Sequence, residues 1–190
     1  MTTIACIGWG SLIWDPRQLP IQRHWFEDGP LLPIEFVRQA RDGRVTLAIS
    51  QAARPVRTLW AIMDLDDLCD ARAALRDREG CTDERIGFWP GGAAPDEHPH
   101  IARWAAARDV DAVVWTGLKP VFGGVDRTPS EDEVVDYLRG LRGTVRELAE
   151  RYIRRAPRQT DTAYRRRIEA EFGWTPLDGW PPAQRPPYAG

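Results

Sequence analysis

The alternation of hydrophobic and polar positions predicts a chain whose strands come early and whose helices come late. Short apolar or β-branched runs bounded by turn residues are typical of strands. Such runs occur at residues 3–7, 32–38, 45–50, 58–63, 85–89 and 111–116. An Asp42-Gly43 pair between the second and third runs predicts a hairpin.

Apolar residues spaced three and four apart predict the helices. The first begins at Asp64 or Asp66, either of which can cap it, and ends near Gly80. The longest begins at Ser130, where Glu133 completes a capping box, and its apolar face continues to residue 152. Residues 91–99 are expected to form a loop. Two shorter helices are expected at 101–108 and 161–172.

This order of elements predicts the α+β class, with helices packed on a small mixed sheet. We expect that sheet to be barrel-like, either closed or strongly curved. A length of 190 residues suits one domain. We place that domain at residues 1–155 and expect 156–190, a last helix and a tail rich in Pro and Trp, to pack on it.

Charge and composition argue against several classes of partner. The net charge is −2 and the basic residues are spread along the chain, so no nucleic-acid partner is predicted. No segment approaches the roughly 20 apolar residues that cross a bilayer, and the N-terminus lacks the pattern of a signal peptide. The three cysteines form no CxxC pair, which favours a reducing cytoplasm. The oligomeric state is left open.

A glycine-rich loop, Gly8-Trp9-Gly10-Ser11, directly follows the first strand. Glycine permits positive φ angles, and such a loop can turn successive N–H groups toward one ligand. A dinucleotide-binding fingerprint would need glycine where Ile13 stands, and a nucleophile elbow would need the pattern G-x-S-x-G. Both are excluded, which leaves an amide-lined ligand site or a structural turn.

The longer run Gly8-Trp9-Gly10-Ser11-Leu12-Ile13-Trp14 resembles the N-terminal signature of the gamma-glutamylcyclotransferase superfamily, most closely its glutathione-specific branch. The resemblance covers roughly residues 3–155. It implies that the amides of residues 8–13 hold the gamma-glutamyl group of a substrate.

The same resemblance implies a catalytic glutamate beside the loop. The Arg78-Glu79-Gly80 element at the end of the first predicted helix supplies Glu79 as the general acid and base. Taken alone, a glutamate at a helix end is usually a solvated charge. Arg38 and Arg44, on strands near the loop, are candidates for the substrate's α-carboxylate, or else surface arginines.

The reaction implied is intramolecular. The α-amine of a gamma-glutamyl peptide or amine attacks its own side-chain carbonyl, closes 5-oxoproline and expels the second amine. Nucleophile and electrophile belong to one molecule, so no cofactor is expected. No metal is expected either, since Pro99 separates His98 from His100 and breaks the helix that would align them.

Two alternatives stay open beside this enzyme. One is a catalytically silent module that binds gamma-glutamyl compounds. The other is acyl transfer or deprotection of a gamma-glutamyl-tagged metabolite. The chain departs from the family pattern at Trp9, which replaces a tyrosine or phenylalanine, and at 85–88, where a tyrosine is usual. Residues 91–108 and those after 156 resemble additions.

Overall fold

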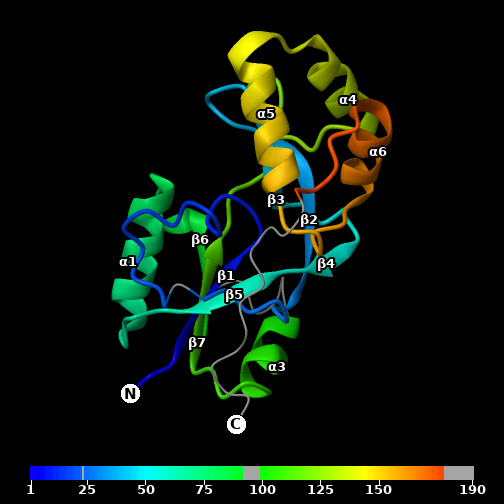
Figure 1. Cartoon of the computed structure of the whole chain (residues 1–190). Coiled ribbons are helices and arrows are strands. Elements are labelled where there is room, and N and C mark those ends of the chain that lie inside the picture. Colours follow the sequence, from blue (N-terminus) through cyan, green and yellow to red (C-terminus); the bar gives the residue numbers. More distant parts are fainter. Residues whose placement is uncertain (23, 92–98, 178–190) are drawn as a thin grey trace.

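Two β-sheets form the centre of the fold in the computed structural model, which describes residues 1–22, 24–91 and 99–177 (Figure 1). The α+β class is confirmed. The first sheet has the order β5-β1-β7-β6, with β5 Leu59–Ile62, β1 Ile4–Gly8, β7 Ala112–Thr116 and β6 Ile86–Trp89. The second has the order β3-β2-β4, with β3 Val45–Ile49, β2 Leu31–Gln39 and β4 Pro55–Arg57. Within the described ranges the strands therefore divide between two sheets, neither of which closes into a barrel.

The first sheet is mixed and the second is antiparallel. Strand β1 runs parallel to β7 and antiparallel to β5, and β6 is antiparallel to β7. The β2–β3 hairpin turns at Asp42-Gly43 as predicted, with Gly43 at φ +82°. The strand expected at 58–63 is confirmed as β5, whereas β4 was not predicted, and the chain changes sheets between the two at the buried Thr58. Residues before it pair with β2 as β4, and residues after it pair with β1 as β5.

The first sheet is buried on both faces, which explains why every residue of β1 is buried. Alternate side chains of a strand point to opposite faces. Ala5 and Ile7 accordingly enter a core shared with the second sheet and the later helices, whereas Ile4 and Cys6 enter a core on the face that carries α1 (Leu68–Glu79). The end of β1 is thus fixed between two layers of packing.

Helix α1 packs against β7 and β6, and Arg78 in its last turn donates to the Asp15 carbonyl in the loop that follows β1. Its N-cap is Asp67, whose carboxylate accepts from the N–H groups of residues 69 and 70, so the expectation of Asp64 or Asp66 is wrong. Gly80 caps the C-terminus in the left-handed conformation, as predicted. The buried face of α1 carries Ala71, Leu75 and Arg78.

The long helix predicted from Ser130 to residue 152 is divided into two. The capping box of Ser130 and Glu133 is confirmed, but α4 (Glu131–Gly140) ends at Leu141, whose backbone is extended. Helix α5 (Gly143–Arg155) then begins at Gly143, at φ +53°. Glycine disfavours a helix interior by about 1 kcal/mol, and two glycines three residues apart explain the break.

The remaining helices are close to their predicted positions. Helix α3 (His100–Ala106) contacts β7, and α6 (Ala163–Phe172) packs against β2 and α4. No described helix has the length and apolar character that crossing a membrane requires. The expectations for most of the 91–99 loop and for the end of the tail fall on residues 92–98 and 178–190, outside the described residues. The domain boundary at 155 remains a prediction.

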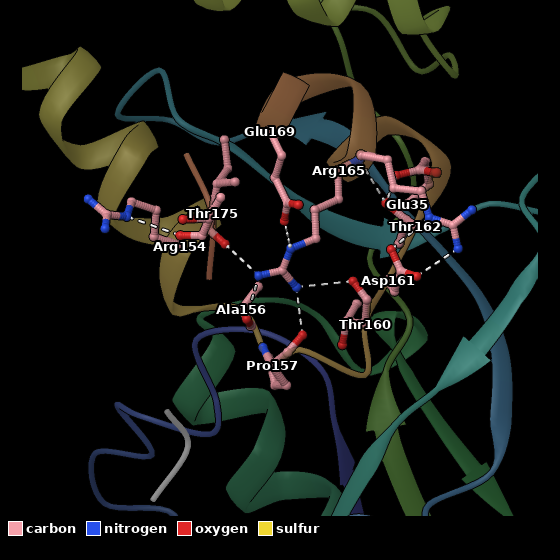
Figure 2. Close-up of polar contacts among 12 residues, drawn as sticks. Glu35, Arg154, Ala156, Pro157, Thr160, Asp161, Thr162, Arg165, Glu169 and Thr175 are labelled. Carbon is pink, nitrogen blue, oxygen red and sulfur yellow. Dashed lines mark hydrogen bonds and ion pairs between the residues drawn. The ribbon is translucent and has the colours of Figure 1, made fainter. Parts of the chain in front are cut away.

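A buried arginine fastens α6 to the rest of the chain (Figure 2). Arg165 is 1% exposed, and each of its guanidinium nitrogens donates to protein oxygens. Nε donates to Glu169, Nη1 to the carbonyls of Pro157 and Thr160, and Nη2 to those of Ile153 and Ala156. The side chain therefore caps the end of α5 and ties the 157–160 segment to α6.

Candidate functional site

The glycine loop leaves β1 through a tight helical turn. The Ile13 N–H donates to the Gly10 carbonyl (3.0 Å), and the Asp15 N–H donates to the Ser11 carbonyl (2.8 Å). The N–H groups of residues 9–12 donate to no other described residue. They are the free donors of the loop, whereas the amide of Ile13 is already engaged.

Five of the six predicted loop residues line one cavity. Its volume is about 800 Å³, and its wall includes residues 8–12. Ile13 does not line it, because its side chain is buried in the core on the α1 face. The prediction of Ile13 as a binding residue therefore finds no support in its position.

The glycines are required because neighbouring side chains pack closely against them, and not because the backbone adopts unusual angles. Neither Gly8 nor Gly10 has a positive φ, so the expectation that the loop uses the left-handed region is wrong. A Cβ at Gly8 would lie 2.7 Å from the ring of Trp25, and one at Gly10 would lie 2.5 Å from the hydroxyl of Tyr152. Both distances are shorter than side chains tolerate.

Glu79 lines the same cavity, from the last turn of α1. It follows Leu75 by four residues and therefore shares the buried face of α1. Its side chain is 13% exposed, and Oε1 accepts from Arg78 Nη1 at 2.8 Å and from Thr116 Oγ1 at 3.2 Å. Oε2 accepts no hydrogen bond from the described residues. One carboxylate oxygen is thus fixed and the other is available.

Arg78 joins the carboxylate to the loop. The side chain is 5% exposed, and its Nη2 donates to the Asp15 carbonyl (2.5 Å) and, at 3.4 Å, to Ser11 Oγ. The same guanidinium pairs with Glu79 through Nη1. A single planar group with donors on several sides therefore holds the carboxylate and the loop in fixed relation.

Tyr152 supplies a hydroxyl over the loop. Its Oη accepts the Leu47 N–H (3.3 Å) and lies against Gly10. Burial raises the pKa of Tyr152 to about 12, so the group is a neutral O–H donor near pH 7. It donates to no described residue, which leaves its proton available to a ligand in the cavity.

Both predicted arginines line the cavity. Arg44 lies beside the loop, with its guanidinium carbon 5.5 Å from the centre of the Tyr152 ring and its Nε 2.8 Å from Asp42 Oδ2.

Arg38 reaches the cavity from strand β2, and its side chain donates to the Lys119 carbonyl (2.6 Å). A register shift between Phe36 and Arg38 in β2 interrupts the alternation of that strand, so that Phe36 and Val37 are both buried and Arg38 reaches the cavity. The role of Arg38 and Arg44 toward a carboxylate remains a prediction.

The nearby thiols are poor nucleophiles. Burial raises the pKa of Cys6, and burial together with the charge of Glu79 raises the pKa of Cys81. A protonated thiol reacts slowly. Among the described residues, no three His, Cys, Asp or Glu side chains gather to hold a metal ion. Most of the Asp96–His100 cluster lies outside those residues.

Sequence reasoning missed three groups of the site. Arg78 was noted only as part of a motif, Tyr152 as part of an apolar helix face, and Thr116 as the end of a strand. A signal existed for Arg78, because it follows Leu75 by three residues and must share its buried face. Tyr152 comes from a helix more than 140 residues along the chain from the loop, and no local pattern links the two.

We compared the chain with known protein families, with curated proteins and with solved structures, and none of the three comparisons finds a match.

Proposed function

We propose that this protein is a gamma-glutamylcyclotransferase-like enzyme, which converts a gamma-glutamyl peptide or amine into 5-oxoproline and a free amine. The observation that carries the proposal is the position of Glu79. Its carboxylate shares one cavity with the free amides of residues 9–12, and Arg78 donates both to this carboxylate and to the hydroxyl of Ser11 in the loop. The resemblance of residues 8–14 to the superfamily signature supports the same reaction.

Glu79 carries the protons in this scheme. The substrate's α-ammonium gives a proton to Oε2, and the freed amine attacks the γ-carbonyl carbon to form the ring C–N bond. Glu79 returns the proton to the leaving nitrogen and the bond from that carbon to this nitrogen breaks. The ring nitrogen gives up its second proton, through Glu79, to the released amine, which departs as an ammonium. A carboxylate with one oxygen anchored and one available suits these transfers.

The loop and Tyr152 stabilise the charge that develops on the carbonyl oxygen. The N–H groups of residues 9–12 and the O–H of Tyr152 belong to residues that line the cavity, and they donate to no described residue. Removing one donor of this kind costs about 3 kcal/mol of transition-state stabilisation. Arg44, beside the loop, is the candidate for the substrate's α-carboxylate.

No cofactor or metal is needed for this cyclisation, because the attacking amine and the carbonyl are held in one substrate. We place the reaction in the cytoplasm, since Cys6, Cys69 and Cys81 are all free thiols, which suits a reducing compartment.

The test is product formation from a panel of gamma-glutamyl compounds. Purified protein is incubated with glutathione, several gamma-glutamyl dipeptides and a non-peptide gamma-glutamyl amine, and 5-oxoproline is measured by mass spectrometry. The proposal expects 5-oxoproline and the matching free amine in equal amounts. No 5-oxoproline from any compound, with a cooperative thermal transition showing that the protein is folded, would refute the activity.

Two other outcomes identify the alternatives. Thermal stabilisation by a gamma-glutamyl compound without product would identify a binding module of the same fold. Product from the non-peptide amine alone would identify deprotection of a tagged metabolite.

A further inference from the structure

The cavity carries more positive charge than a glutamyl group requires. Its described lining includes two carboxylates, Asp42 and Glu79, against six arginines, at positions 17, 38, 41, 44, 78 and 85. Three of these arginines have carboxylate partners: Arg78 pairs with Glu79, Arg44 with Asp42, and Arg17 with Asp15 at 3.5 Å. The other three have none among the described residues.

Those three arginines converge from separate elements. Arg38 is the last residue but one of β2, Arg41 lies in the β2–β3 turn, and Arg85 directly precedes β6. The side chain of Arg38 bonds only to a carbonyl oxygen, and those of Arg41 and Arg85 make no hydrogen bond or ion pair with a described residue. Burial lowers the pKa of Arg38, and the charges of Arg85 and Arg41 lower it further, while Asp126 offsets part of this. Arg85 and Arg41 therefore each repel Arg38, and all three residues line the cavity.

Their place relative to Glu79 follows from one short segment after β7. Thr116 Oγ1 bonds to Glu79, the Gly117 N–H donates to the Arg85 carbonyl (2.7 Å), and the Lys119 carbonyl accepts from Arg38. Three residues span at most about 10 Å. The Arg38 guanidinium and the backbone of Arg85 are thus placed near Glu79, within reach of a group on the nitrogen that Glu79 protonates, and Arg41 lines the same cavity. Arg44 lies instead beside the loop and Tyr152.

We infer that Arg38, Arg41 and Arg85 form a second anion subsite, which takes a dianionic group on the leaving amine: a phosphate monoester or a pair of carboxylates. Guanidinium groups bind both kinds of anion through paired N–H donors. A single carboxylate would leave two of the three charges unbalanced, whereas a dianion balances most of the cluster. The claim that the anion is carried on the leaving amine rests on the proposed function. The subsite itself binds an anion with or without turnover.

The kinetic test compares two pairs of substrates, and in each pair one member carries an additional anionic group on the leaving amine. Gamma-glutamyl-O-phosphoethanolamine is compared with gamma-glutamyl-ethanolamine, and gamma-glutamyl-aspartate with gamma-glutamyl-alanine, all at constant ionic strength. Each dianion is expected to exceed its partner in kcat/KM by about tenfold or more, the factor that one charge-assisted hydrogen bond supplies. A gain confined to the first pair identifies phosphate, and one confined to the second identifies paired carboxylates. Equal kcat/KM within both pairs overturns the inference.

Substitution locates the subsite. Arg85→Gln is expected to lower the ratio of kcat/KM for each dianionic substrate to that for its partner by about tenfold. Arg41→Gln does the same from an exposed position, where loss of folding is a minor concern. Arg103→Gln, an exposed arginine on α3 outside the cavity lining, is the matched control and keeps the wild-type ratio. A ratio unchanged in both Arg85→Gln and Arg41→Gln overturns the assignment.

A binding measurement separates this inference from the proposed function. Calorimetry with O-phosphoethanolamine and with aspartate needs no catalysis. Binding of either by the wild type and by Arg103→Gln, but not by Arg85→Gln, supports the subsite even where no 5-oxoproline forms. No binding of either compound to the wild type contradicts the subsite, even in a protein that cyclises neutral gamma-glutamyl amines.

Discussion

Replacing Arg165 by methionine removes the group that fastens α6, and the structure allows the loss to be estimated. Five hydrogen bonds disappear: four to backbone carbonyls and one to Glu169. A hydrogen bond contributes about 1 kcal/mol net, and leaving partners of a buried charge unsatisfied costs about 3–5 kcal/mol in total. Methionine fills most of the volume of the arginine stem, so the cavity contribution is small. We therefore expect the free energy of unfolding to fall by about 3–5 kcal/mol.

Urea denaturation measures this loss. A domain of this size has a free energy of unfolding of about 5–15 kcal/mol and an m value of about 2–3 kcal/mol/M, so the midpoint falls by roughly 1–2 M. Arg166→Met is the matched control, because Arg166 is next along the chain and its exposed guanidinium pairs with Asp161 at the surface. If Arg165→Met lowered the midpoint no more than Arg166→Met, Arg165 would not fasten α6.

Two further predictions concern packing and pH. Gly10→Ala places a Cβ 2.5 Å from the Tyr152 hydroxyl and should lower the free energy of unfolding by about 1–3 kcal/mol, as overpacking does. In a Tyr152→Phe background the nearest ring carbon is 3.5 Å away, so the same change should cost much less; an equal cost in both backgrounds would contradict the predicted clash. Burial raises the pKa of Glu35 above 4.5, although Phe36, Thr162 and Tyr164 donate to its carboxylate. The folded state therefore binds the proton of the Glu35 carboxyl more tightly than the unfolded state does. The contribution of this proton to the free energy of unfolding is complete below pH 4.5 and is lost as the pH rises through the folded pKa. Urea denaturation of wild type and Glu35→Gln across pH 4–7 should show the advantage of the wild type shrinking as the pH rises, and an advantage that grew instead would mean a lowered pKa.

Much of the fold could be predicted from the sequence, because several of the signals in it are local. The Asp42-Gly43 turn, the Ser130–Glu133 capping box and the Gly80 C-cap each depend on residues within one turn of the chain, and each forms as predicted. The break between α4 and α5 was missed because apolar spacing continues across it. Gly140 and Gly143 were the local signal, and they outweigh that spacing.

The candidate site was harder to predict, since its parts meet only in three dimensions. The loop and Glu79 came from a motif resemblance, and the structure brings them into one cavity. Tyr152 could not be predicted, because whether a tyrosine on an apolar helix face points into a core or over a loop depends on how the helix packs. The sheet change at Thr58 likewise depends on pairing partners that are distant in sequence.

The most direct test of the central claim is the rate of 5-oxoproline formation by Glu79→Gln. Glutamine keeps the shape of the side chain and removes its basicity, while Glu84→Gln, an exposed change five residues along the chain, is the control. With the best substrate of the panel, and with melting temperatures showing that both variants are folded, Glu79→Gln should lose at least about 100-fold in kcat, the range for a general acid–base group. Glu84→Gln should retain the wild-type rate. Full turnover by Glu79→Gln would contradict the assignment of Glu79 as the proton carrier.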